Sequence, residues 1–307
     1  MSMNDELDPM GLPPPLILPL TEDDEERINR MKGNSWIGYD RALNIRAQMD
    51  ALLRHPRTHR MPNLALIGET NNGKTMLLRN FCKLNNPPED PNADKTLLPV
   101  LLIETPPAPD EGRLYYAMLD RVSACGSARE PEDSKLRRIK IILLHLETRM
   151  IILDDFFNIG AGTPTKRRKF LNALRNLSND LQLPIVVAGT PETLNVLSVD
   201  PSIANRFRPV FLPKWQDSNL QEFARFVLSV EKTLLLKKPC NLMNEAALRS
   251  LLIFGEGLLG EIVAILKLLA ESAIRSGKES IDGEMITKKN LAALGWVMPS
   301  DRSRHHE

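Results

Sequence analysis

The sequence is poor in features that mark several classes of protein. Its three cysteines, Cys82, Cys125 and Cys240, are odd in number and far apart, which argues against a disulfide framework and for a reducing compartment. No apolar run approaches the ~18 residues of a membrane span, and the acidic start, MSMNDELDPM, lacks the pattern of a secretory signal. We therefore expect a soluble, intracellular protein.

A strong charge of either sign is also missing. Lysine and arginine number 40 against 39 aspartates and glutamates, so the net charge is +1. This balance excludes a uniformly basic coat, and any contact with nucleic acid has to come from a local patch or from several copies summed in an assembly. The 307 residues suffice for one large domain or two moderate ones.

Five short, nearly continuous apolar runs predict strands that helices bury on both faces. They are residues 63–68, 99–104, 150–155, 184–189 and 209–213, with helical stretches at 73–84, 113–125, 134–148 and 166–181 between them and a helix at 41–53 before them. This alternation predicts an α/β fold with a parallel sheet of right-handed crossovers. Beyond Trp215 the pattern turns helical, at 217–233, 244–253, 259–276 and 286–294, and predicts an all-helical second domain.

These changes in pattern divide the chain into four predicted parts. They are a proline-rich and acidic arm (1–25), an α/β domain with a preceding helix (26–214), a helical lid domain (215–296) and a polar tail (297–307). Prolines make the arm extended. Its apolar residues, Leu16 to Leu20, dock either on a neighbouring subunit or partner or on their own domain.

The segment from Gly68 to Thr75, GETNNGKT, matches the phosphate-binding pattern G-x-x-x-x-G-K-[ST], or Walker A motif, between a predicted strand and a predicted helix. Glycines let successive N–H groups point at phosphate oxygens, and the helix N-terminus adds partial positive charge. We expect Lys74 to reach the β- and γ-phosphates and the Thr75 hydroxyl to bind Mg²⁺. The predicted ATP-binding segment consists of Gly68, Glu69, Thr70, Asn71, Asn72, Gly73, Lys74, Thr75 and Met76.

Acids follow the third predicted strand. In MIILDD an apolar strand delivers Asp154 and Asp155 at its carboxyl end, where a nucleoside triphosphatase holds its Mg²⁺. Asp154 is predicted to hold the metal, directly or through water. Asp155 either orients the attacking water, although it is one methylene shorter than the glutamate of many such ATPases, or ends the strand as a capping residue.

Two further residues are candidates for hydrolysis. Thr190 directly follows the predicted strand of residues 184–189. It is predicted to form a hydrogen bond to the γ-phosphate or to the attacking water, to cap the next helix, whose first residue would be Pro191, or to do both. Arg206 stands before the last strand, where an arginine at a subunit edge completes a neighbour's site in trans. The alternative is an ordinary surface arginine.

With these elements in order, the chain resembles the AAA+ ATPases, and among them the TniB/TnsC-type transposition ATPases. The resemblance covers roughly residues 25–295. It is carried by RINRMKGNSWIGYDRALNIRAQMDALLRHP, RMPNLALIGETNNGKT, DDFFNIGAGTPTKRRKFLNALRNLSNDLQLPIVVAGTPE, the RF of ANRFRPVFLPKW, and GLLGEIVAILKLLAESAIRSG.

The resemblance implies further roles. Trp36 and Ile37 take the place where AAA+ proteins cradle adenine, with core packing of Trp36 as the alternative, and Arg206 takes the finger position, with Arg208 as the alternative. The stretch from Gly257 to Glu261 lacks the nucleotide-sensing arginine that many AAA+ helical domains carry.

What is known of the family implies a bacterial, cytoplasmic ATPase that needs ATP and Mg²⁺ and oligomerises as a ring or filament on double-stranded DNA. Its implied partners are an integrase-type transposase (TniA/TnsB-like) and a TniQ-type target selector. ATP hydrolysis, expected to be slow and dependent on assembly, would disassemble the oligomer.

Basic clusters offer candidate DNA contacts, and a solvated helix face is the alternative for each. The first candidates are Arg113, Lys166, Arg167, Arg168 and Lys169, followed by Arg175, Arg137, Arg138 and Lys140. Without a base-stacking or base-reading motif, such contacts reach the DNA backbone with little sequence preference. Two rival functions stay open: a helicase or initiator loader of the DnaC/IstB kind, and a nucleotide-gated protein switch that does not bind DNA.

Overall fold

The structure is a computed structural model that describes residues 23–88, 95–124, 126 and 130–302, in two compact units. We call residues 44–70 and 74–212 the sheet unit, and residues 1–43, 71–73 and 213–307 the helical unit. Of the predicted arm, residues 1–22 lie outside the described part, as do Cys125 and residues 303–307 of the predicted tail.

The sheet unit contains five parallel strands in the order β2-β3-β4-β1-β5. The strands are β1 (Asn63–Ile67), β2 (Val100–Glu104), β3 (Met150–Asp154), β4 (Ile185–Gly189) and β5 (Phe207–Phe211). The predicted parallel sheet is thus confirmed. The sequence prediction starts β5 at Pro209, two residues too late, because it takes the proline as the first residue of the strand. β5 lies at the edge of the sheet, where a residue without an N–H is tolerated within a strand.

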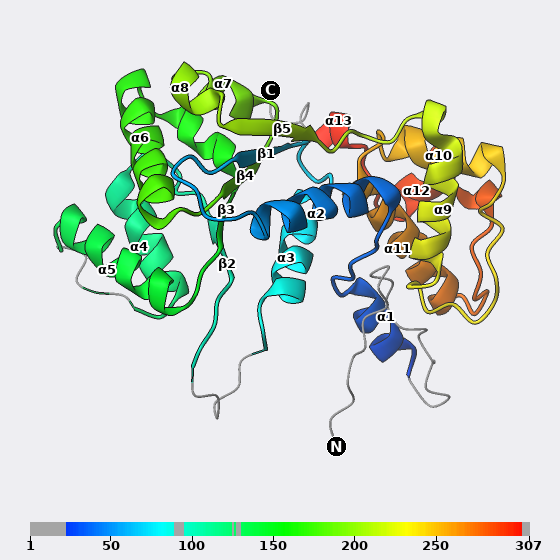
Figure 1. Ribbon diagram of the computed structural model, residues 1–307. Coiled ribbons are helices and arrows are strands. Elements are labelled where there is room, and N and C mark those ends of the chain that lie inside the picture. The colour runs from blue at the N-terminus through cyan, green and yellow to red at the C-terminus, as the bar shows by residue number, and fades with distance from the viewer. Residues whose placement is uncertain (1–22, 89–94, 125, 127–129, 303–307) are drawn as a thin grey trace. The chain divides into compact units, whose positions relative to one another are not determined.

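Helices connect the strands of the sheet unit. They are α3 (Lys74–Asn85), α4 (Glu111–Arg121), α5 (Glu132–His145), α6 (Pro164–Leu181), α7 (Glu192–Leu197) and α8 (Pro201–Ala204), with the 3₁₀ turn η1 (Phe156–Ala161) after β3. Figure 1 shows α4, α5 and α6 together on one side of the sheet and α3 on the other. Alternate strand residues such as Ala65, Ile67 and Leu153 join α4, α5 and α6 in one buried core. Both faces are covered, which explains the continuous apolar runs.

The helical unit contains α1 (Asp24–Lys32), α9 (Leu220–Glu231), α10 (Glu245–Phe254), α11 (Leu259–Arg275), α12 (Lys288–Ala293), α13 (Pro299–Arg302) and the 3₁₀ turns η2 (Asp217–Asn219) and η3 (Gly283–Met285). The boundary between the units falls within α2 (Asp40–Leu53). The predicted all-helical domain after Trp215 is confirmed. Its core includes the aromatic side chains of Trp215, Phe223 and Phe226, whose rings lie 5.5 to 6.4 Å apart.

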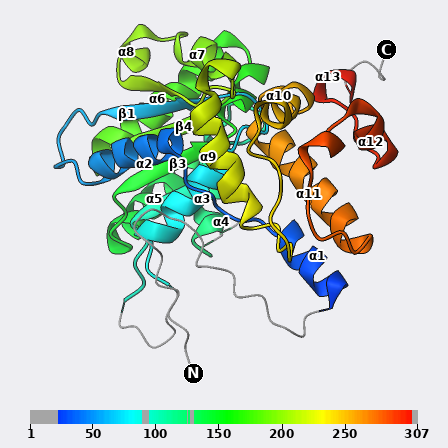
Figure 2. The same ribbon diagram turned by 90° about the vertical axis from the view of Figure 1, so that its right-hand side faces the viewer.

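Helix α1 packs along α11, as both views show (Figures 1 and 2). Its Arg27 is 1% exposed and donates to both carboxylate oxygens of Glu279, at 2.8 Å each, and to the carbonyl oxygen of Leu235 at 2.6 Å. The hydrogen bond from Arg27 lowers the pKa of Glu279 to about 2. A buried ion pair therefore fixes this helix to the helical unit.

No helix in the described part of the chain is long and apolar enough to cross a membrane.

Candidate functional site

The GETNNGKT segment joins the end of β1 to the start of α3, as predicted. Its glycines are required by geometry. A Cβ on Gly68 would lie 2.8 Å from the carbonyl oxygen of Leu212, and Gly73 has a φ of +88°, which side chains other than that of glycine rarely tolerate. Asn71 also has a positive φ, of 57°, a conformation that asparagine accepts more readily than most residues.

Lys74 opens α3 and is 7% exposed. Its Nζ donates to the carbonyl oxygens of Gly68 and Glu69, both at 2.8 Å. Burial lowers the pKa of Lys74, while the negative charges of Asp154, Asp155 and Glu69 act in the opposite direction. The ammonium is thus held within the loop that would surround a phosphate.

The side chains of Thr75 and Asp154, the two predicted metal ligands, are in contact, and their metal role stays a prediction. The Thr75 hydroxyl donates to Oδ2 of Asp154 at 2.7 Å, and Oδ1 of Asp154 accepts the N–H of Asp155 at 3.0 Å. Asp154 is only 6% exposed. A hydroxyl and a buried carboxylate are the hard oxygen donors that Mg²⁺ prefers, so this pair fits the ion.

Asp155 follows β3 with a φ of +52° and begins the turn into η1. Burial raises its pKa most, the charges of Asp154 and Glu104 raise it further, and Lys74 lowers it. Its carboxylate therefore lies in a field of like charges beside the predicted metal pair.

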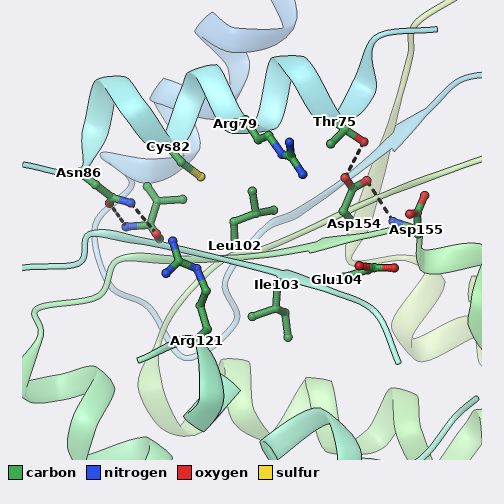
Figure 3. Close-up of a pocket in the computed structure, with 11 residues that line it drawn as sticks. Thr75, Arg79, Cys82, Asn86, Leu102, Ile103, Glu104, Arg121, Asp154 and Asp155 are labelled. Carbon is green, nitrogen blue, oxygen red and sulfur yellow. Dashed lines mark hydrogen bonds between the residues drawn. The ribbon is translucent and has the colours of Figure 1, made fainter. Parts of the chain in front are cut away.

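A pocket of about 440 Å³ opens beside these acids. It is lined by residues of α3 and the residue after it, of β2 along its whole length, and of the last positions of β3 and α4 with the residue after β3: Thr75, Arg79, Cys82, Asn86, Val100, Leu102, Ile103, Glu104, Arg121, Asp154 and Asp155. In Figure 3 the carboxylates of Glu104, Asp154 and Asp155 gather at one end and the Arg121 side chain lies toward the other. Sequence reasoning gave Glu104 no role, although it is an acid at the carboxyl end of an apolar strand, as Asp154 is.

Thr190 follows β4 and is half-buried. Its hydroxyl donates to the carboxylate of Glu192, which lowers the pKa of that glutamate. The predicted cap is wrong by one residue: α7 begins at Glu192, so Pro191 is its N-cap and not its first residue, and no side-chain cap bond is formed. The role of Thr190 in hydrolysis stays a prediction.

Residues 71–73 belong to the helical unit, where they contact the N-terminus of α11. Gly260 N–H donates to the Asn71 carbonyl at 2.9 Å, and the Asn71 amide donates to Glu261 at 2.9 Å. A Cβ on Gly260 would lie 2.0 Å from Oδ1 of Asn71, so this glycine permits the approach. Glu261 also accepts two bonds from Arg302 of α13, at 2.9 and 2.7 Å. Arg302 falls in the predicted tail, and sequence reasoning missed it because its partner lies 41 residues away.

The two predicted adenine contacts lie in the helical unit. Ile37 is part of its buried core. Trp36 is half-buried, and its indole Nε1 is buried without a hydrogen-bond partner among the described residues. The adenine role of both residues stays a prediction.

Arg206 stands directly before β5, and its Nη1 donates to Oδ1 of Asn179 at 2.8 Å. Burial lowers its pKa, and the positive charges of Arg60 and Arg175 lower it further. Three guanidinium groups therefore share one region of the sheet unit. Arg208, the alternative finger, is exposed on β5.

The predicted DNA-binding residues divide into two sets. Lys169 forms an ion pair with Glu111, and Arg167 donates to the carbonyl oxygen of Gly160. For the side chains of Arg113, Lys166 and Arg168, the described residues supply no hydrogen-bond or ion-pair partner. The second cluster is also engaged in part, because Arg138 pairs with Glu130 and Lys140 with Asp180.

Together, the strand order, the GETNNGKT segment between β1 and α3 and the acids at the end of β3 define the class: the sheet unit has the fold of an AAA+ ATPase. The family model of the bacterial TniB proteins matches residues 27–217. The chain therefore belongs to the TniB family. A search of curated proteins finds no match to the chain.

Solved structures agree with the fold. The ORC2 protein of Aeropyrum pernix, solved with ADPNP and ADP, has a TM-score of 0.59 at 14% identity over 85% of this chain and 71% of its own. Cdc6p of Pyrobaculum aerophilum has a TM-score of 0.58 at 17% identity, over 84% of this chain and 68% of its own. The ORC1 protein of A. pernix in complex with DNA has a TM-score of 0.55 at 12% identity, over 83% of this chain and 63% of its own. Identities this low show a shared fold alone.

Proposed function

We propose that this protein is an ATPase that assembles on double-stranded DNA and regulates DNA transposition. The single observation that carries the ATPase part is the Thr75–Asp154 hydrogen bond next to buried Lys74, at the loop that begins α3. Membership of the TniB family supports the transposition part. The proposed partners are further copies of the chain, an integrase-type transposase and a TniQ-type target selector.

The proposed chemistry is transfer of the γ-phosphoryl group of ATP to water. Lys74 binds the β- and γ-phosphates, while Thr75 and Asp154 hold Mg²⁺, which neutralises charge on the phosphate oxygens. Asp155 orients the attacking water, and Thr190 bonds either that water or the γ-phosphate. Trp36 and Ile37 contact the adenine.

Arg206 completes the site of a second copy in trans. An arginine finger stabilises charge that develops on the transferred group, so hydrolysis would depend on assembly. The neighbouring Arg60 and Arg175 support this role because three positive charges together favour an anion over a neutral surface. Arg208 is the alternative finger.

DNA binding is proposed to use the phosphate backbone. Arg113, Lys166 and Arg168 are the best candidates, since no described residue forms a hydrogen bond or an ion pair with their side chains, although the charge of Arg168 acts on Asp200. Lys169 and Arg167 are occupied by contacts within the sheet unit. A few phosphate contacts for each subunit become substantial when many subunits line one duplex. The ORC1 protein of A. pernix, which shares the fold, was solved in complex with DNA, and this supports the proposal.

The test is binding to a random duplex by fluorescence anisotropy at two salt concentrations, with ATP, ADP or no nucleotide. The proposal predicts cooperative, salt-sensitive binding with ATP only, and none for Lys74→Ala. Absence of binding under every condition would discard the DNA part and favour a nucleotide-gated protein switch. Binding that requires a helicase partner would favour a loader instead.

A further inference from the structure

We propose that Glu104 is a second catalytic carboxylate, which together with Asp155 binds the attacking water and accepts its proton. This inference rests on the ATPase function proposed above. It assigns a chemical role to a residue of β2, the strand next to β3, which ends in Asp154 and is followed by Asp155.

The sheet register places Glu104 at the site. Glu104 is the last residue of β2 and lies opposite Asp154, the last residue of β3, in a parallel pair. Adjacent strands are ~4.8 Å apart, so the two strands deliver their final acids side by side at the same edge of the sheet. Figure 3 shows the Glu104 carboxylate at the same end of the pocket as those of Asp154 and Asp155.

The three acids differ in what already engages them. Both oxygens of Asp154 accept hydrogen bonds, from the Thr75 hydroxyl and the Asp155 N–H. Glu104 is exposed to the pocket, and no described residue donates a hydrogen bond to it or pairs with it. Its carboxylate is therefore available to a water molecule.

The side chains of Asp155 and Glu104 also differ in how far they can extend into the pocket. Asp155 starts from a left-handed backbone conformation and has one methylene group fewer than glutamate. Glu104 has the additional methylene and approaches the same end of the pocket from the neighbouring strand. Both carboxylates line the same pocket.

A purely structural role explains this placement poorly. A third carboxylate beside Asp154 and Asp155 adds like-charge repulsion, and Glu104 gains no hydrogen bond from a described residue in return. Repulsion of this kind is tolerated where a cation and a proton-transfer step use the charges.

The step balances. The water oxygen forms a bond to the γ-phosphorus, while the bond from that phosphorus to the β–γ bridging oxygen breaks and leaves its electron pair on ADP. One proton of the water passes to the Glu104 or Asp155 carboxylate and then to solvent. The products are ADP and phosphate, with no further reactant.

The variant Glu104→Gln removes the negative charge and keeps the shape of the side chain. Loss of a general base costs on the order of a hundredfold in rate, so we expect kcat to fall by about that factor with DNA present. The affinity for a fluorescent ATP analogue and the unfolding midpoint should not change. The variant Glu104→Asp, which keeps the charge, should recover part of the rate.

Glu147→Gln is the matched control. Glu147 is also an exposed glutamate of the sheet unit, and it pairs with Lys95 away from the pocket. It should hydrolyse ATP at the wild-type rate. A Glu104→Gln protein that turns over like Glu147→Gln would overturn the inference, as would a variant whose only defect is weaker ATP binding.

A double-mutant cycle tests whether Glu104 and Asp155 share the water. Asp155→Glu adds the missing methylene group directly after β3. In that background Glu104→Gln should lower kcat by a factor at least ten times smaller than in the wild type. An equal cost in both backgrounds contradicts shared binding. If the wild-type protein binds ATP but never hydrolyses it, the proposed function fails too, whereas active wild type with active Glu104→Gln defeats this inference alone.

Discussion

The two units use their buried charges differently. In the sheet unit, the described charged residues that are less than a tenth exposed are Lys74, Lys135 and Asp154, and in the helical unit they are Arg27, Glu261 and Glu279. Lys74 and Asp154 gather around the loop before α3 with other acids near them, whereas Arg27 and Glu279, like Arg302 and Glu261, form ion pairs.

We interpret the first group as charges kept for a ligand and the second as charges that hold the structure together. Lys74 and Asp154 are held by hydrogen bonds to carbonyl and hydroxyl oxygens and not by an ion pair with each other, an arrangement that leaves both charges to a ligand in the proposed function. A buried ion pair satisfies itself and fixes one element to another. Substitutions in the sheet unit should therefore alter activity at constant stability, and those in the helical unit should alter stability first.

The largest effect is expected from Lys74→Ala. Removing the ammonium takes away the charge that we propose binds the β- and γ-phosphates, so ATP binding should fall below detection in a titration with a fluorescent analogue. Lys83→Ala, an exposed lysine of the same helix, is the control and should bind normally. Normal ATP-dependent assembly of Lys74→Ala on DNA would refute the role of this loop.

Arg206→Ala should lose on the order of a thousandfold in turnover in the assembled state, as removal of an arginine finger does. ATP binding by the isolated subunit should be intact because the finger acts in trans. Arg208→Ala is the comparison variant. A loss of turnover in that variant alone would assign the finger role to Arg208. An equal loss of Arg206→Ala in isolated subunits would remove the trans role.

Arg27→Met tests the structural charges. It removes the main partner of the buried Glu279 and leaves only the longer contacts of Lys237, which should cost roughly 3 kcal/mol in the free energy of unfolding. Arg225→Ala breaks the exposed pair with Asp40 and should cost at most about 1 kcal/mol. Urea unfolding measures both. Equal effects of the two variants would contradict a structural role for the buried pair.

Asp155→Ala should slow hydrolysis on the order of a hundredfold and spare ATP binding, because it removes a water-orienting carboxylate and no phosphate contact. Rates of phosphate release give the turnover, and the analogue titration gives the affinity. Unchanged turnover would transfer the role to another residue, with Glu104 the first to examine.

The smallest effect concerns pH. The pKa of Glu279 is about 2 in the folded chain and about 4.3 when unfolded, so its ion pair stabilises the fold fully above pH ~4.5, and the contribution is lost as the pH falls toward 2. The stability difference between wild type and Arg27→Met should therefore shrink over that range in urea unfolding. A stability difference that does not change with pH would mean that Arg27 does not stabilise the ionised form of Glu279.

Local sequence patterns predicted the parts of the fold that local physics determines. Apolar runs locate all five strands because helices bury both faces of the sheet, and the GETNNGKT motif and Asp154 follow from their positions at strand ends. Helix α1 escaped prediction because its buried Arg27 is stabilised by Glu279, 252 residues away. Glu104 carries the same local signal as Asp154, an acid at the end of an apolar strand, but only the register between β2 and β3 shows that the two lie opposite each other.

The most direct test of the account is phosphate release from ATP and Mg²⁺ by the wild-type protein, with and without a random DNA duplex. The account predicts slow release that rises several-fold with DNA and with protein concentration, because Arg206 completes the site of a second copy. No release above that of Lys74→Ala, with or without DNA, would contradict it.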